Sequence, residues 1–309
     1  MFHCPPNVFR GLAILLMASI APIHTAALAR DIYVDNVAGD DVFDGNVPRS
    51  IGPGVGPLRT ITRALRAATG GNRIILANTG QPYRESVSLV GSRRSGPSFL
   101  PFTIEGNGAI LDGTWPVPPD AWQWVADDVF RFEPGRKDFA RLFLDGVPAV
   151  MHPTGPRSGK VPPLETKEWA LVDGWIYFRV EPASLPQQYA LSYAALPVGF
   201  TLYKVENAVI ANVVVQGYAL DGINMHDAIG PSRLVGVTCR GNGRSGVAVV
   251  GASQVELQAC LIGDNGQSQL LVADYSICNL VNCELLDRAG PKWKLSDEAR
   301  LLLDGSPVR

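Results

Sequence analysis

Apolar residues recur with a fixed spacing in the second half of the chain. Four segments, which begin at residues 199, 222, 246 and 269, align with one another at steps of 23 or 24 residues. Within each segment every second position is apolar, which is typical of a β-strand with one buried face. The positions expected to point inward are Phe200, Ile223, Val247 and Leu270, and then Leu202, Met225, Val249 and Val272. A second strand is expected in every coil, at residues 211–214, 236–239, 259–262 and 282–285.

A single coil of this length is too thin to bury an apolar core. Stacked coils close a continuous interior, so the repeat predicts an all-β solenoid, a parallel β-helix, with its main coils at residues 196–287. A leucine-rich repeat would keep leucine at fixed positions with helical spacing between the strands, and the sequence has neither feature. Residues 288–309 would form a C-terminal cap or tail, in which residues 296–302 fit either a short helix over the last coil or a frayed end.

Residues 30–114 are expected to form an N-terminal cap and the first coils. The pattern predicts strands at 31–35 and 73–76, a helix at 60–68, and a further coil at 102–113. Tyr33-Val34, the segment TITRAL at 60–65 and Tyr83-Arg84-Glu85 follow one another in this order. Together they resemble the opening of secreted right-handed parallel β-helix proteins of the pectate-lyase-like superfamily. The resemblance implies a right-handed solenoid whose short helix plugs the open N-terminal end of the stack.

Composition changes between residues 115 and 195. This stretch holds every tryptophan except Trp293, together with many prolines, and alternating segments at 129–132, 141–146 and 175–180. We interpret it as a small β subdomain inserted between two coils. It resembles an insertion of some β-helix glycosidase-like proteins with an "LFxDG … G-x-x-Y" pattern. Its tryptophans could stack on sugar rings or form the core of the subdomain.

The first 29 residues have the features of a signal peptide. Arg10 precedes an apolar run at 11–21, and Ala27-Leu28-Ala29 matches the small residues around a cleavage site. We expect cleavage after Ala29 and a secreted or periplasmic protein. No segment has the 20 or so apolar residues that a membrane span needs.

The charge of the chain bears on its binding partners, and its cysteines bear on disulfide formation. The net charge is −2 and the estimated pI is 6.1, and no basic stripe suggests nucleic acid. We expect a monomer whose partner is a polysaccharide. Cys260 and Cys283 fall at equivalent inward positions of adjacent coils. The interpretation as buried free thiols is preferred to a disulfide, because stacked strands hold the two side chains side by side.

The repeat concentrates polar residues on one outward strand face. Tyr203 and His226 should project outward on neighbouring coils about 5 Å apart, with Thr201 and Asn224 beside them and Lys204 and Asp227 at the strand ends. β-Helix enzymes that act on acidic polysaccharides use such a face to remove the proton next to a carboxylate. In that chemistry His226 would be the base, Tyr203 the acid, and Asn224 and Lys204 would stabilise the carboxylate. We therefore predict an exported carbohydrate-active protein, with lyase or C5-epimerase chemistry on a uronic-acid polymer along a groove between the insertion and this face.

The segment from Asp221 to Asp227 supports this expectation by resemblance. It is similar to the "D-P-H-D" loop of mannuronan C5-epimerases at His226 and Asp227, whereas Asn224 and Met225 stand where that loop has Asp and Pro. It also resembles a "DGxNxH" pattern of secreted β-helix proteins, which implies no particular activity.

Other interpretations remain open from the sequence. A glycoside hydrolase would need two carboxylates, for which Asp221 and Asp227 are the obvious pair. A non-catalytic surface or adhesion protein would use the face only for binding, with His226 as a surface residue or a contact of the insertion. No cofactor is expected. Calcium is an alternative for which aspartates supply the oxygen atoms: Asp221, Asp227, Asp264 and Asp274 in the coils, and Asp40, Asp41 and Asp44 in the N-terminal loop. Three arginines, Arg233, Arg240 and Arg244, would be solvated charges or would hold an anionic sugar.

Overall fold

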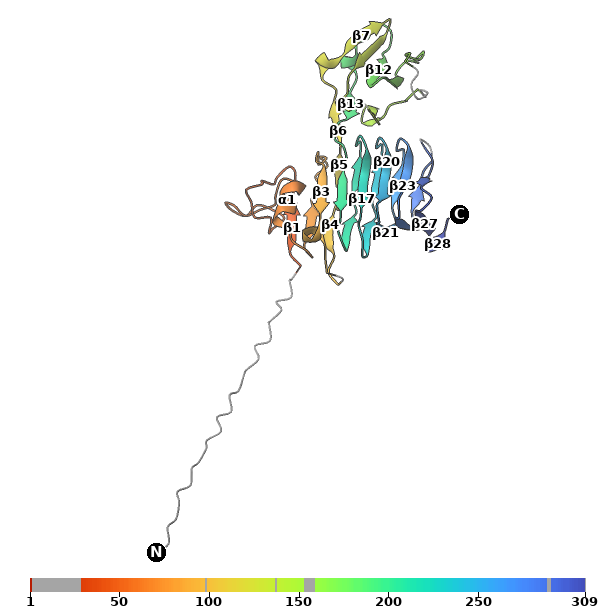
Figure 1. The fold of residues 1–309 in the computed structure, drawn as a ribbon. Coiled ribbons are helices and arrows are strands. Elements are labelled where there is room, and N and C mark those ends of the chain that lie inside the picture. Colours follow the sequence, from red (N-terminus) through yellow and green to blue (C-terminus); the bar gives the residue numbers. More distant parts are fainter. Residues whose placement is uncertain (2–28, 98, 137, 153–158, 288–289, 309) are drawn as a thin grey trace.

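The computed structural model describes residues 1, 29–97, 99–136, 138–152, 159–287 and 290–308. The predicted signal peptide lies outside these residues, apart from Met1 and Ala29. Within the described part, the helices are the seven-residue α1 (Ile61–Ala67) and three short 3-10 turns, and none is long and apolar enough to span a membrane. The rest is built from strands that wind into a stack of coils, with a separate group of strands on one side (Figure 1).

Each complete coil contributes one strand to each of three parallel sheets. Sheet 1 consists of β3 (Val87–Val90), β14 (Phe200–Tyr203), β17 (Asp221–His226), β20 (Ser245–Val250), β23 (Ser268–Val272) and β26 (Trp293–Leu295). Its register aligns Phe200 with Ile223, Ile223 with Val247, and Val247 with Leu270. The predicted repeat and its inward positions are confirmed, because all four side chains are at most 1% exposed.

Two strands follow in each coil where the sequence predicted one. Sheet 2 consists of β1 (Asp31–Val34), β2 (Arg73–Leu76), β4 (Phe102–Glu105), β15 (Ala208–Ala211), β18 (Ser232–Val235), β21 (Gln254–Gln258), β24 (Ile277–Val281), β27 (Arg300–Leu303) and the antiparallel β28 (Ser306–Pro307). Sheet 3 consists of β5 (Ile110–Asp112), β16 (Val214–Gln216), β19 (Thr238–Arg240), β22 (Leu261–Gly263) and β25 (Glu284–Leu285). The predicted second strand was wrong in its position because it straddles the turn between these sheets. Asn212, Gly236, Ala259 and Asn282 there have positive φ, which no strand tolerates.

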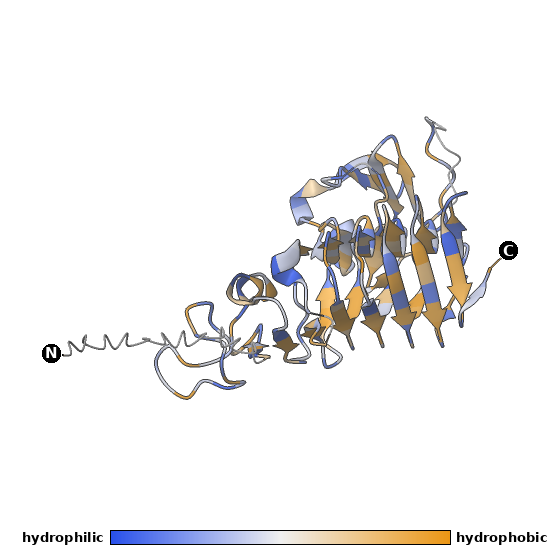
Figure 2. Cartoon of the chain, turned by 60° about the horizontal axis from the view of Figure 1, so that its bottom comes forward, coloured by the Kyte–Doolittle hydropathy of each residue, from blue (hydrophilic) through white to orange (hydrophobic). Residues whose placement is uncertain are grey.

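The interior of the stack is one apolar column. It runs from Ile32 in β1 to Leu301 in β27, and the strands of Figure 2 alternate hydrophobic and hydrophilic residues along their length. A buried polar ladder accompanies this column at the turn from sheet 3 to sheet 1. Asn242 Nδ2 donates to Asn265 Oδ1 at 2.9 Å, and both side chains are fully buried. Asn242 and Asn265 stand 23 residues apart, in step with the repeat, so equivalent turns of adjacent coils are joined by this bond.

Helix α1 lies at the N-terminal end of the stack, where its Ile61, Ala64 and Leu65 join the apolar core. The carboxylate of Glu85 accepts hydrogen bonds from the Ile61 and Thr62 amides at 2.8 and 2.9 Å. It thereby satisfies amides that have no partner within the helix. The short helix is held at its start by a residue from the segment that leads into β3.

Antiparallel strands occupy the chain between β5 and β14 and project from the stack (Figure 1). We call them the inserted unit. One sheet consists of β6 (Thr114–Pro116), β13 (Leu191–Ala194), β9 (Leu142–Leu144) and β10 (Val147–Pro148), and the other of β7 (Gln123–Ala126), β8 (Val129–Phe132), β12 (Trp175–Arg179) and β11 (Trp169–Val172). The unit has its own core, which includes Trp169, Phe132 and Phe178.

The C-terminal segment continues the solenoid. The helix that residues 296–302 could have formed is absent, because Arg300–Leu303 is strand β27 and pairs with β24 of the preceding coil. Leu301 is buried in the column, while Leu302 on the opposite face of the strand is partly exposed.

Candidate active site on the outward face of sheet 1

Tyr203 and His226 lie together on the surface of sheet 1. Their strands, β14 and β17, pair in parallel and place the two residues directly opposite each other. The ring centroids are 5.4 Å apart in an edge-to-face arrangement. Tyr203 is 37% exposed and the His226 side chain 46% exposed, so both reach solvent. The predicted placement of these side chains is confirmed.

The turn after these strands brings charged groups beside the aromatic pair. Lys204 and Asp227 have φ values of 52° and 53°, so the chain bends at equivalent positions of the two coils. Lys204 Nζ lies 5.2 Å from the centre of the Tyr203 ring. Asp227 Oδ2 is 3.7 Å from His226 Nε2, beyond hydrogen-bond length, and its Oδ1 accepts from the Ala252 amide at 3.0 Å.

Gly251 makes room for this arrangement on the next coil. A Cβ atom at this position would lie 2.3 Å from Asp227 Oδ1 and 2.9 Å from His226 Cδ2, and its φ is +73°. Any other residue would therefore displace the Asp227 carboxylate and the His226 ring.

Asp221 belongs to the interior of the stack. Its carboxylate is fully buried and accepts hydrogen bonds from Ser245 Oγ at 2.6 Å, Asn224 Nδ2 at 3.0 Å and the guanidinium of Arg244. The ion pair with Asp221 raises the pKa of Arg244 above its usual value. Of the two carboxylates predicted as a pair, the Asp227 side chain is 33% exposed, whereas that of Asp221 is not exposed.

Asn224 retains only part of its hydrogen-bonding capacity for a ligand. Its amide donates to Asp221, which fixes the side chain at the outward face beside Thr201. Both residues are partly exposed.

The interpretation of Arg244 as a solvated charge was wrong, because its guanidinium holds the Asp221 carboxylate from the next coil.

The inserted unit does not wall the face around His226. Its contacts lie at the turns before sheet 1, where Phe139 O approaches Gly243, Arg141 donates to Asp264 O at 3.1 Å, and Phe143 packs on Ala219. His226 is at the opposite end of β17. The predicted groove between the insertion and Tyr203–His226 was therefore wrong. The sequence predicted that the insertion lies between two coils, but it could not predict which sheet of the stack the inserted unit contacts.

A pocket that sequence analysis missed borders the exposed pair. It has a volume of about 410 Å³ and is lined by Lys204, Glu206 and Asp227 from the turns, and by Ser92 and Ser95. These two serines belong to a segment more than a hundred residues earlier, with the 3-10 turn η1 (Ser92–Arg94), and Ser95 Oγ accepts from the Glu206 amide at 2.8 Å. The equivalent of Glu206 on the next coil is the apolar Ile229, so no periodic signal could have singled it out.

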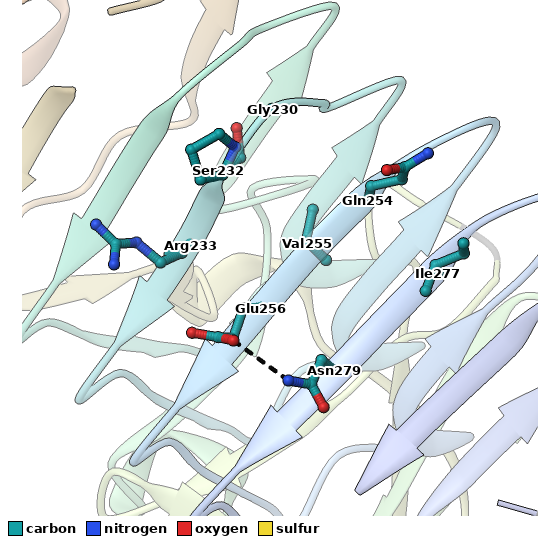
Figure 3. A pocket seen from close by; sticks show the side chains of 9 residues that line it. Gly230, Ser232, Arg233, Gln254, Val255, Glu256, Ile277 and Asn279 are labelled. Carbon is teal, nitrogen blue, oxygen red and sulfur yellow. Dashed lines mark hydrogen bonds between the residues drawn. The ribbon is translucent and has the colours of Figure 1, made fainter. Parts of the chain in front are cut away.

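A second hollow lies on the outward face of sheet 2 and is shown in Figure 3. It has a volume of about 370 Å³ and crosses β18, β21 and β24. Glu256 accepts a hydrogen bond from Asn279 at 3.2 Å, whereas Arg233 extends away from both. Arg233, one of the three arginines considered for an anionic sugar, lines it, whereas the residues predicted for catalysis do not.

Several of the aspartates considered as calcium ligands accept hydrogen bonds from backbone amides at different turns. Asp227 and Asp274 each accept a backbone amide of the neighbouring turn, at Ala252 and Gly251. Asp41 accepts the Arg59 and Thr60 amides. A hydrogen bond from the Asn46 backbone lowers the pKa of Asp44. In the described ranges no three metal-binding side chains converge.

Comparison with known proteins identifies the architecture. Residues 196–306 match the family model described as "Right handed beta helix region". This match and the parallel coils show a right-handed parallel β-helix. A search of curated proteins finds no match.

Solved structures resemble this right-handed β-helix. A protein described as a glycoside hydrolase has a TM-score of 0.54 at 10% identity, over 82% of this chain and 74% of its own. A complex of XylC with xylose has a TM-score of 0.43 at 12% identity, over 89% and 67%. The pectate lyase Pel9A has a TM-score of 0.39 at 11% identity, and the match spans 82% of this chain and only 53% of that enzyme. At such identities the first of these likenesses establishes a shared fold.

Proposed function

We propose that the protein binds a polysaccharide on the outward face of sheet 1 and processes a uronic-acid polymer there by lyase or C5-epimerase chemistry. The observation that carries this proposal is the contact between two solvent-exposed acid–base side chains, Tyr203 and His226, on adjacent coils. A solved structure that shares the β-helix fold is described as a glycoside hydrolase, which supports carbohydrate as the ligand class.

Each residue has a role in the proposed reaction. His226 removes the proton from the carbon next to the uronate carboxylate, and Lys204 offsets the charge that develops on that carboxylate. In a lyase, the electron pair forms a double bond while the bond to the leaving sugar oxygen breaks, and Tyr203 protonates that oxygen. In an epimerase, Tyr203 returns a proton to the opposite face of the same carbon. Thr201 and Asn224 contribute hydrogen bonds to the sugar.

Burial of Asp221 argues against hydrolysis by the Asp221–Asp227 pair. The groups at the exposed pair are an imidazole, a phenol and an ammonium; the Asp227 and Glu206 carboxylates line the adjoining pocket, and Asp227 already uses one oxygen to hold the Ala252 amide. Removal of a proton next to a carboxylate needs a base and an acid, whereas hydrolysis needs two accessible carboxylates.

The proposal is tested by incubating the purified protein with polygalacturonate, alginate and glucuronan. A lyase produces ultraviolet absorbance from the new double bond, and an epimerase changes the sugar proton signals in NMR. We expect turnover on one of these polymers, and a loss of about 100-fold or more in His226→Ala, because a general base contributes at least that factor. Tyr203→Phe should lose turnover in the same way.

Matched substitutions separate chemistry from folding. His152→Ala and Tyr33→Phe change the same residue types away from sheet 1, in the inserted unit and on strand β1 of sheet 2, and should keep wild-type turnover. Full activity of His226→Ala would refute its role. Binding of a polymer without turnover would instead favour the non-catalytic alternative, in which the same exposed face only holds the chain.

A further inference from the structure

The inserted unit and sheet 3 enclose a pocket that is separate from the Tyr203–His226 pair. Its volume is about 290 Å³. The hairpin of β9 and β10 forms one wall, where Val147 is 62% exposed and Pro148 packs on Gly241. Gln216 and Arg240 of sheet 3 and the turn residue Asp264 complete the lining. The pocket thus combines an apolar wall with polar groups of both charge signs.

The Arg240 side chain is held in place by stacked polar residues. Asp112, Gln216 and Arg240 occupy the same register position on three adjacent coils. Arg240 Nε donates to Gln216 Oε1 at 2.9 Å, and Gln216 Nε2 donates to Asp112 Oδ2 at 3.2 Å. Both ends of the Gln216 amide are therefore used. The two terminal nitrogens of Arg240 remain for a ligand, on a side chain whose orientation is already fixed.

The junction places two arginines, Arg240 and Arg141, beside the turn at Asp264. In the part of the chain that the structure describes, neither Arg240 nor Arg141 has a carboxylate at ion-pair distance. Arg141 instead donates to the backbone oxygen of Asp264. Arg240 and Asp264 line the same pocket without forming an ion pair with each other. A ligand with an anionic group could therefore pair with Arg240 while its hydroxyl groups donate hydrogen bonds to Asp264.

We propose that this pocket binds one acidic sugar unit of the polysaccharide. The uronate carboxylate pairs with the Arg240 guanidinium, sugar hydroxyls donate to Asp264, and the apolar ring face packs against Val147 and Pro148. This inference rests on the proposed function, whose uronic-acid polymer it takes as the ligand, and deepens it by assigning a second site that recognises the charge of that polymer. It assigns the recognition of charge to sheet 3 and the inserted unit, away from sheet 1.

The test measures binding rather than turnover. Trisaccharides of galacturonate, mannuronate and glucuronate, and their neutral counterparts galactose, mannose and glucose, are titrated into the full protein by calorimetry. We expect one acidic trisaccharide to bind at least about tenfold more tightly than its neutral counterpart. Arg240→Gln should remove this preference, whereas Arg240→Lys, which keeps the charge but not the paired donors, should retain part of it. Arg300→Gln, an exposed arginine of β27, is the matched control and should bind like the wild type.

The outcomes distinguish this inference from the proposed function. Absence of binding by all three acidic trisaccharides, equal affinity for the neutral sugars, or unchanged affinity in Arg240→Gln would overturn the inference. Each of these results leaves the His226 turnover test intact. Conversely, loss of acidic preference in Arg240→Gln together with full activity of His226→Ala would uphold the pocket and refute the catalytic role.

Discussion

Asp221 shows at the residue scale why the site could be predicted only in part. The 23–24-residue repeat and strand alternation place Tyr203 and His226 on one face, and the structure confirms this. Alternation cannot tell whether a polar residue at a strand start is buried. Asp221 is buried because Arg244 from the next coil neutralises it, and that pairing follows from side-chain packing rather than from the period.

The Asp221–Arg244 pair should stabilise the fold. Replacing Asp221 with Asn leaves the Arg244 guanidinium without its anion at a largely buried position, so we expect unfolding free energy to fall by about 3 kcal/mol. Urea denaturation measures this change. Asp297→Asn makes the same change at an exposed position and should cost less than about 0.5 kcal/mol. Equal effects of the two substitutions would show that the buried pair contributes nothing.

The thiols of Cys260 and Cys283 form a second residue-scale unit. Both are free, as the preferred interpretation from sequence held. The hydrogen bond from the Cys260 thiol, together with the Cys260 amide at 3.4 Å, lowers the pKa of Cys283 to about 7. Burial raises the pKa of Cys239 and Cys278 instead.

Alkylation should therefore select Cys283. We expect its labelling by iodoacetamide to rise as pH passes through about 7, because the thiolate is the reactive form, while Cys239 and Cys278 stay unlabelled in the folded protein. Mass spectrometry of peptides identifies the site. In Cys260→Ala the labelling midpoint should move to higher pH. A midpoint unchanged by this substitution would contradict the proposed hydrogen bond as its cause.

The strands and the turns between them differ in how clearly the sequence encodes them. Apolar spacing predicted helix α1 and the strands β1, β2, β14, β17, β20 and β23 close to their observed bounds. It failed at 211–214 and its equivalents because a single left-handed residue, such as Asn212, divides one apolar run into two strands. The asparagine ladder was predictable because Asn242 and Asn265 recur in step with the repeat.

That ladder should contribute strongly to the stack. Asn265 Nδ2 donates to the Cys239 and Gly263 carbonyls, and its Oδ1 accepts from Asn242. Replacing Asn265 with Ala leaves these buried groups without partners, so we expect a loss of about 3 kcal/mol in thermal or urea unfolding. Asn279→Ala on the outward face of sheet 2 serves as control and should cost about 1 kcal/mol or less. A loss no greater in Asn265→Ala than in the control would argue against the ladder.

At the scale of the whole molecule, the position of the inserted unit could not be derived from the sequence. Local patterns predicted its strands, and Trp169 indeed lies in its core. Its direction is set by long-range contacts, such as Phe143 and Pro148 on Gly241. These contacts turn the unit toward sheet 3 and leave Tyr203 and His226 open to solvent.

The most direct test of the central claim follows the histidine ring signals by NMR during titration with acidic oligosaccharides. His226 and His152 are the two histidines of the described chain, and His152 lies in the inserted unit, 3.2 Å from Glu168. If the outward face of sheet 1 binds the polymer, the His226 signals shift with saturation while those of His152 stay in place. Saturable binding that leaves the His226 signals unchanged would contradict the account.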